Sequence, residues 1–132
     1  MKEDITLYAP VILVTLAYVS LYYLLMVNGL VVKIKVAKRC RDDGEPFLRY
    51  TGNYPEVLAA DRAQLNTLEH MPPFLILLWL QAWVVSIQSA AWLGGLYVVI
   101  RASYPFFLGR TLTRSFPRRV FINTFSGYAV LL

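Results

Sequence analysis

The 132-residue sequence has very little of the chemistry that most soluble enzymes use. Its one cysteine, Cys40, excludes an internal disulfide. We interpret Cys40, which lies between Arg39 and Arg41, as an incidental loop cysteine; the alternative is a thiol activated by its cationic neighbours. The one histidine, His70, argues against imidazole catalysis, and we interpret it as an interfacial residue. No Ser-His-Asp set, metal-spaced Cys/His cluster or glycine-rich phosphate loop is present.

Charge is scarce as well. Only 16% of the residues are charged and 58% are hydrophobic, a balance typical of membrane proteins. The net charge of +5 is compatible with a nucleic-acid or a membrane partner. Four long apolar runs favour the lipid bilayer and argue against nucleic acid.

The apolar runs and the turn residues between them predict an all-α membrane protein. A single integral membrane domain over residues 1–132 is expected, built as an up-down-up-down bundle of four transmembrane helices. The predicted helices cover roughly 5–36, 55–87, 90–109 and 117–132, with a short turn at Gln88 and Ser89. The first apolar run, 5–32, would extend ~42 Å as a helix, and the last helix only ~24 Å. The first therefore tilts or projects from the ~30 Å hydrocarbon layer, and the last spans only with local thinning or helix partners.

Basic residues predict the orientation of the bundle. Seven lysines and arginines lie in or near the first connection, and four lie in the third: Lys33, Lys35, Lys38, Arg39, Arg41, Arg49, Arg62, Arg110, Arg114, Arg118 and Arg119. The opposite side has only Lys2. By the positive-inside rule, both basic loops face the cytoplasm and both termini lie on the other side.

Polar residues in the second predicted helix form a stripe at the start of an apolar run. Arg62, Asn66 and Glu69 are spaced i+4 and i+3, so they share one face of a helix. Gln64 points away from that face by roughly 160°. The following Pro72 and Pro73 remove backbone donors and predict a kink between the polar and the apolar half.

The third predicted helix carries Arg101 and Tyr104 on one face, about two turns inside its apolar run. A cation at such depth costs roughly 3 kcal/mol, so Arg101 needs an anion, a water-filled cavity or a charged ligand. One interpretation is an ion pair between Arg101 and Glu69 that locks the bundle, and another is that the stripe is a solvated extension. The third is a polar pocket for a ligand with carboxylates and an amine.

The segment Arg62-Ala63-Gln64-Leu65-Asn66-Thr67-Leu68-Glu69-His70-Met71-Pro72-Pro73-Phe74 closely resembles the helix-two motif of the MAPEG family, the membrane-associated proteins in eicosanoid and glutathione metabolism. Chain length, four spans and orientation are also similar. The resemblance implies a homotrimer that binds glutathione between adjacent subunits, near the cytoplasmic side. It implies glutathione contacts for these residues, some from the neighbouring chain: Arg62, Gln64, Asn66, Glu69, Arg101, Tyr104 and, as the nearest match to a helix-one arginine of the family, Lys33, with Lys35 as the other candidate.

The resemblance also implies an enzyme that stabilises the glutathione thiolate with an arginine. The thiolate would attack a lipophilic electrophile or hydroperoxide, in a transferase or peroxidase reaction. Candidates for that arginine are Arg114 and Arg118, with Arg119 close by. Leu108 replaces a tyrosine of many members, which leaves a non-enzymatic lipid-binding or scaffold protein of the same family as the alternative. A small four-helix cation exporter is disfavoured because the first predicted helix has no acid after Asp4.

Overall fold

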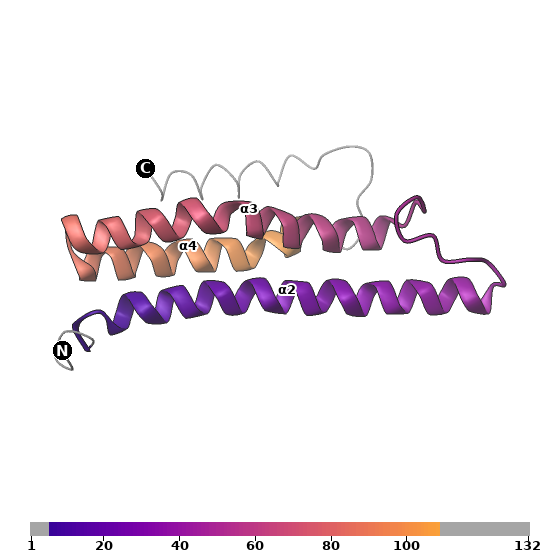
Figure 1. Cartoon of the computed structure of the whole chain (residues 1–132), viewed down its shortest axis with the longest axis horizontal. Helices are drawn as coiled ribbons and strands as arrows, with labels where there is room; N and C mark the ends of the chain where they lie inside the picture. The colour runs from indigo at the N-terminus through magenta and orange to yellow at the C-terminus, as the bar shows by residue number, and fades with distance from the viewer. Residues whose placement is uncertain (1–5, 109–132) are drawn as a thin grey trace.

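The computed structural model describes residues 6–108, which form three long helices and no strand. The helices are α2 (Ala9–Asp42), α3 (Pro55–Val84) and α4 (Ile87–Leu108), and they lie side by side in alternating directions (Figure 1). Each of the three helices contacts the other two. The described part is therefore all-α with the predicted up-down-up connectivity, and the fourth predicted helix, 117–132, lies outside it.

Helix α2 is longer than the sequence predicts at its carboxyl end. It continues to Asp42 instead of ending near 36, and so it includes Cys40 in its last turn, not in a loop. The helix ends where Gly44 adopts a left-handed conformation, with φ of 75°. The Gly44 N–H donates to the Arg41 carbonyl, and the Glu45 N–H donates to the Cys40 carbonyl. These two bonds form a Schellman motif, in which glycine ends a helix without steric cost.

The turn between α3 and α4 lies at Val85 and Ser86, not at the predicted Gln88 and Ser89. Ser86 determines the position of this turn, because the Ser86 hydroxyl accepts a hydrogen bond from the Ser89 N–H at 3.4 Å. A serine that precedes a helix and accepts from the third N–H is a favoured N-terminal cap. Helix α3 begins at Pro55, as predicted, and is continuous through Pro72 and Pro73.

Three stacked rings, one from each helix, form the centre of the larger core. The Phe74 ring centroid lies 4.7 Å from that of Tyr18 and 4.6 Å from that of Tyr97. Both tyrosine hydroxyls have partners: Tyr18 donates to the Thr67 carbonyl at 2.8 Å, and the Tyr97 hydroxyl lies 3.1 Å from Nδ1 of His70. Buried aromatic rings with satisfied hydroxyls fix the three helices in one register.

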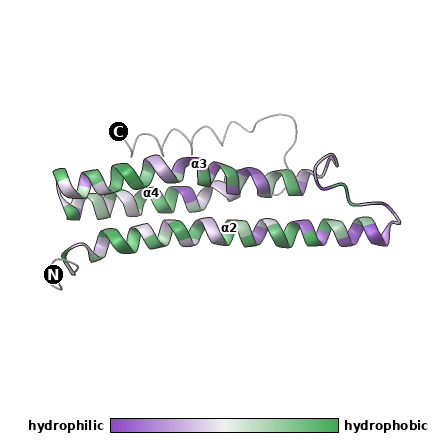
Figure 2. Cartoon of the chain, viewed as in Figure 1, coloured by the Kyte–Doolittle hydropathy of each residue, from purple (hydrophilic) through white to green (hydrophobic). Residues whose placement is uncertain are grey.

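Hydropathy separates the two ends of the bundle (Figure 2). Hydrophilic residues gather where α2 ends and α3 begins, around the 43–54 connection. Within residues 6–108, α2 is the one helix long and apolar enough to cross a membrane by length and composition. Its 34 residues extend ~51 Å, well beyond a ~30 Å hydrocarbon layer.

Candidate functional site

Arg101 of α4 is the buried polar centre of the bundle. Its side chain is 1% exposed, and its Nη2 donates two hydrogen bonds to Asn66 of α3. One goes to the Asn66 carbonyl at 2.8 Å and the other to its side-chain Oδ1 at 2.6 Å. Bonds from a charged donor are short and strong, so this contact joins α3 to α4 at the level of the polar stripe.

Tyr104 and two further charges complete this polar cluster. The Arg101 guanidinium carbon lies 5.0 Å from the centroid of the buried Tyr104 ring, a cation–π distance. Arg62 and Glu69 are exposed and lie on the same stripe of α3 as Asn66. Five of the predicted ligand residues therefore come together at one place on α3 and α4: Arg62, Asn66, Glu69, Arg101 and Tyr104.

Lys33 and Gln64 lie elsewhere, between α2 and α3. Nζ of Lys33 forms an ion pair with Asp61 Oδ1 at 2.7 Å, and both side chains are partly buried. A Cβ built on Gly29 of α2 would lie 3.7 Å from Oε1 of Gln64, so the Gln64 amide packs against the α2 backbone. The structure thus separates these two residues from the other five predicted ligand residues.

The ion pair between Arg101 and Glu69, one of the three interpretations of these residues, is absent from the part of the chain that the structure describes. Arg101 bonds to a neutral amide instead, and Glu69 is exposed. The reason is geometric, because Asn66 lies on the α3 face closer to α4, where the buried guanidinium ends. Arg101 is therefore a buried cation without a carboxylate partner within residues 6–108.

His70 is a core residue, not the interfacial residue that the sequence predicts. It is 8% exposed and hydrogen-bonded to Tyr97. The signal was available in the spacing, because Ala63, Thr67, His70 and Phe74 follow each other at i+4, i+3 and i+4. All four are buried, so this second stripe of α3, one residue away from the polar one, faces the core.

Leu108, at the end of α4, is buried with Leu25, Ala63 and Tyr104 in a small apolar cluster. Its 4% exposure shows that the position contributes packing and no polar group. The predicted catalytic residues Arg114 and Arg118, like Arg119, lie outside the described residues.

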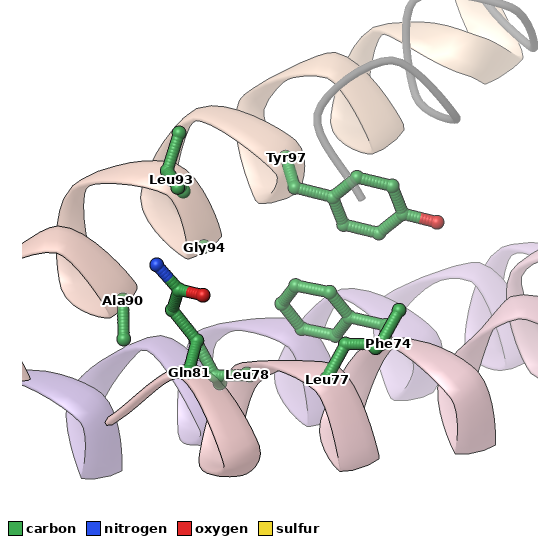
Figure 3. Close-up of a pocket in the computed structure, with 8 residues that line it drawn as sticks. All are labelled: Phe74, Leu77, Leu78, Gln81, Ala90, Leu93, Gly94 and Tyr97. Carbon is green, nitrogen blue, oxygen red and sulfur yellow. The ribbon is translucent and has the colours of Figure 1, made fainter. Parts of the chain in front are cut away.

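Two cavities differ in size and lining. A small one of about 80 Å³ lies between the apolar halves of α3 and α4, where Phe74 faces Tyr97 and the Gln81 amide points toward Gly94 (Figure 3). A larger one of about 640 Å³ lies between α2 and the polar half of α3, near the end of α4. Small residues line its α3 wall, namely Ala59, Ala60 and Ala63. Neither cavity is lined by Asn66 or Arg101, so the polar cluster is a separate feature.

An exposed ion pair closes the polar end of the bundle. Arg39 Nη1 donates to Glu56 Oε1 at 3.0 Å and links the last turns of α2 to the first turn of α3. A bond from the backbone of Glu56 itself and then the Arg39 contact lower the pKa of the Glu56 carboxyl. Such a pair contributes little energy, but it fixes the spacing of α2 and α3 beside the larger cavity.

The sequence model of the MAPEG family matches residues 8–132, almost the whole chain. The chain belongs to the MAPEG family. Searches of curated proteins and of solved structures found no match.

MAPEG proteins are integral membrane proteins, and many members are glutathione-dependent enzymes, while others are not enzymes. Membership confirms the resemblance that the 62–74 segment indicates. It also explains the long apolar α2, which is a membrane-spanning helix of this MAPEG chain.

Proposed function

We propose that this MAPEG protein is a membrane-bound glutathione transferase or glutathione-dependent peroxidase that works as a homotrimer. It activates glutathione as the thiolate for attack on a lipophilic electrophile or hydroperoxide. The observation that carries the proposal is the polar cluster on α3 and α4. In this cluster the buried Arg101, which has no carboxylate partner within residues 6–108, is hydrogen-bonded to Asn66 beside Tyr104.

The residues of the cluster fit the chemistry of glutathione, a tripeptide with two carboxylates, one ammonium group and two peptide units. Exposed Arg62 offers a cation for a carboxylate, and exposed Glu69 offers an anion for the ammonium group. Partly exposed Asn66 offers an amide for a peptide or carboxylate group. Each charged group of the ligand thus has a side chain of opposite charge on this surface.

The position of Lys33 and Gln64 supports a site shared between subunits. Lys33 of α2 and Gln64 of α3 both lie where these two helices pack against each other, away from the polar cluster of the same chain. In a trimer, the α2–α3 side of one subunit would meet the α3–α4 side of the next, and these two residues would reach the ligand of the neighbour. The Lys33 ammonium group would then pair with a ligand carboxylate in place of Asp61, or with both carboxylates.

The proposed topology has four spans, with residues 117–132 as the fourth. The basic end of α2 with the 43–54 connection, and the 110–119 segment, would face the cytoplasm, as the positive-inside rule requires. The polar cluster lies toward the same end of α3, so glutathione would enter from the cytoplasm. The lipophilic substrate would enter from the bilayer.

The proposed thiol activation depends on an arginine that follows α4. A free thiol has a pKa near ~8.5 and is mostly protonated at pH 7. A guanidinium close to the sulfur would stabilise the thiolate by charge and hydrogen bonding, without acting as a base. Arg114 and Arg118 are the proposed residues for this role.

One observation favours a second candidate function, a non-enzymatic lipid-binding or scaffold protein. Leu108 is a buried core residue, so the hydroxyl that a tyrosine would supply at this position is missing. A scaffold could keep the fold and the polar cluster without activating a thiol.

The test is a glutathione titration of the purified protein in detergent, followed by calorimetry and by the ultraviolet absorbance of the thiolate. Glu69→Gln should weaken binding about tenfold, because a charge-assisted hydrogen bond contributes about 1.5–3 kcal/mol. Arg114→Ala or Arg118→Ala should abolish the thiolate signal while binding remains. Glu45→Gln and Arg49→Ala are matched controls, since both residues are exposed in the 43–54 connection.

The outcomes separate the two candidates. Saturable binding with a thiolate signal supports the enzyme, and the arginine variant that loses the signal identifies the activating residue. Binding without any thiolate in the wild type supports the scaffold. No binding at millimolar glutathione would refute both the transferase and the peroxidase proposal.

A further inference from the structure

Arg101 is too deeply buried to be an ordinary ligand contact. Its side chain is 1% exposed, whereas Asn66, to which it bonds, is partly exposed. A dissolved ligand therefore reaches the amide of Asn66 before it reaches the guanidinium. Resemblance to the family implies a glutathione contact for both residues, but the burial of the two side chains distinguishes them.

The two hydrogen bonds from Nη2 fix the orientation of the Asn66 amide. A guanidinium has donors only, so the side-chain atom of Asn66 that lies 2.6 Å from Nη2 must be the oxygen. The second bond, to the Asn66 carbonyl, prevents the guanidinium from following a rotation of the amide. Nδ2 of Asn66 is then the remaining polar atom of that side chain, and it can only donate.

The Nε atom of Arg101 differs from Nη2. The buried Nε of Arg101 has no hydrogen-bond partner in the described part of the chain. A buried donor without an acceptor costs about 1–3 kcal/mol. Arg101 thus lies where Nη2 reaches Asn66 and the guanidinium stacks over Tyr104, although Nε is left without an acceptor there.

We propose that Arg101 is a positioning residue, which turns the Asn66 amide so that Nδ2 is presented as a donor to the ligand. This part of the site then takes an acceptor group, a carbonyl or carboxylate oxygen, and rejects an N–H or ammonium group. The inference rests on the proposed glutathione site, and it assigns the peptide or carboxylate oxygens of glutathione, not its amine, to Asn66.

A double-mutant cycle tests this role. Glutathione dissociation constants are measured by calorimetry for wild type, Asn66→Ala, Arg101→Gln and the double variant. If Arg101 acts through Asn66, each single change weakens binding about tenfold and the double change weakens it no further. The control cycle pairs Arg101→Gln with Arg62→Gln, for which the effects should multiply, because no hydrogen bond joins these residues to each other.

Asn66→Asp gives an independent test if Arg101→Gln does not fold. The carboxylate would pair with Arg101, so the unfolding temperature should be equal or higher, yet an acceptor would replace the Nδ2 donor. Glutathione binding should fall at least tenfold.

Three results would overturn the proposal. Multiplicative effects in the Asn66–Arg101 cycle would mean that Arg101 contacts the ligand itself. Undiminished binding by Asn66→Asp would mean that no donor is needed there. Absence of glutathione binding by the wild type would remove the proposed function and this inference with it, whereas the first two results leave the glutathione site intact.

Discussion

The two halves of α3 are packed in opposite ways. Before Pro72 the core-facing residues are mostly small, and a cavity of about 640 Å³ lies beside them. After Pro72 the core-facing residues include Phe74 and Leu78, and the cavity there is about 80 Å³. The polar half also carries Asn66 and the ion pair made by Asp61, while the apolar half carries no charge. The comparison indicates that large side chains fill the space between the helices in one half, whereas small ones leave a cavity in the other.

Phe74→Ala should give the largest loss of stability. Phe74 stacks on a ring from each neighbouring helix and is 2% exposed, so its removal leaves a cavity that rigid helices cannot close. A loss of about 3–5 kcal/mol is expected. Thermal unfolding in detergent, followed by circular dichroism, measures it.

Phe106→Ala is the control for Phe74→Ala, because Phe106 is 86% exposed. Its unfolding temperature should differ little from that of the wild type. Equal losses in the two variants would mean that the apolar half is not the main source of stability.

Gly94→Ala, which also affects the packing of the apolar half of α3, should give a smaller loss of stability than Phe74→Ala. A Cβ on Gly94 would lie 2.6 Å from Cδ1 of Leu78 and 2.9 Å from Cγ1 of Val14, so all three helices meet at this glycine. Overpacking of about 1–3 kcal/mol should exceed the gain in helix propensity from alanine. The measurement is again the unfolding temperature.

Gly95→Ala sharpens this prediction, because a Cβ on Gly95 would meet nothing within 4 Å. That variant should be as stable as the wild type or more stable, by up to about 1 kcal/mol. Destabilisation of both variants to the same extent would contradict the close helix approach at Gly94.

Arg39→Gln, in the polar half, should give the smallest effect. The Arg39–Glu56 pair is partly exposed, and such pairs contribute about 0–1 kcal/mol. Arg41→Gln is the control, since Arg41 is an exposed cation of the same last turn.

The stability that Arg39 provides should depend on pH in one direction. The pKa of Glu56 is lowered in the folded state, first by a bond from its own backbone and then by Arg39. Its contribution is therefore complete above the unfolded-state pKa and is lost as the pH falls through the lower folded-state value. The difference in unfolding temperature between wild type and Arg39→Gln should shrink below about pH 4. A difference that grows at low pH would contradict this pairing.

Much of the architecture follows from local sequence, and the exceptions are local too. Pro55 correctly predicts the start of α3, and the apolar runs predict long helices in alternating directions. The sequence predicts the carboxyl end of α2 near residue 36, where charged residues replace the apolar run, whereas the backbone shows that the helix continues to a cap at Gly44. For the α3–α4 turn the sequence predicts Gln88 and Ser89, whereas the bond from the Ser89 N–H to the Ser86 hydroxyl starts α4 at Ile87.

The candidate site could be predicted in composition but not in connectivity. Helical spacing places Arg62, Asn66 and Glu69 on one stripe of α3. It does not show which residue of another helix packs against that stripe. Which of the three meets Arg101 depends on the rotation of α4 relative to α3, which the Gly94 contact and the aromatic stack determine. For that reason the sequence leaves an anion, a water-filled cavity and a charged ligand open as partners of Arg101, and the structure shows an amide.

The length of α2 has a consequence for the kind of membrane that suits this protein. Residues 9–32, which precede the first lysine of the helix, number 24 and extend ~36 Å. This apolar length exceeds the ~27 Å hydrocarbon layer of thin membranes and is closer to the ~32–33 Å of thick ones. The mismatch energy, a fraction of a kcal/mol for each ångström, favours a thick bilayer or a tilted helix. Because ion pairs join α2 to α3 at residues 33 and 39, lipid composition would set the tilt of both helices together.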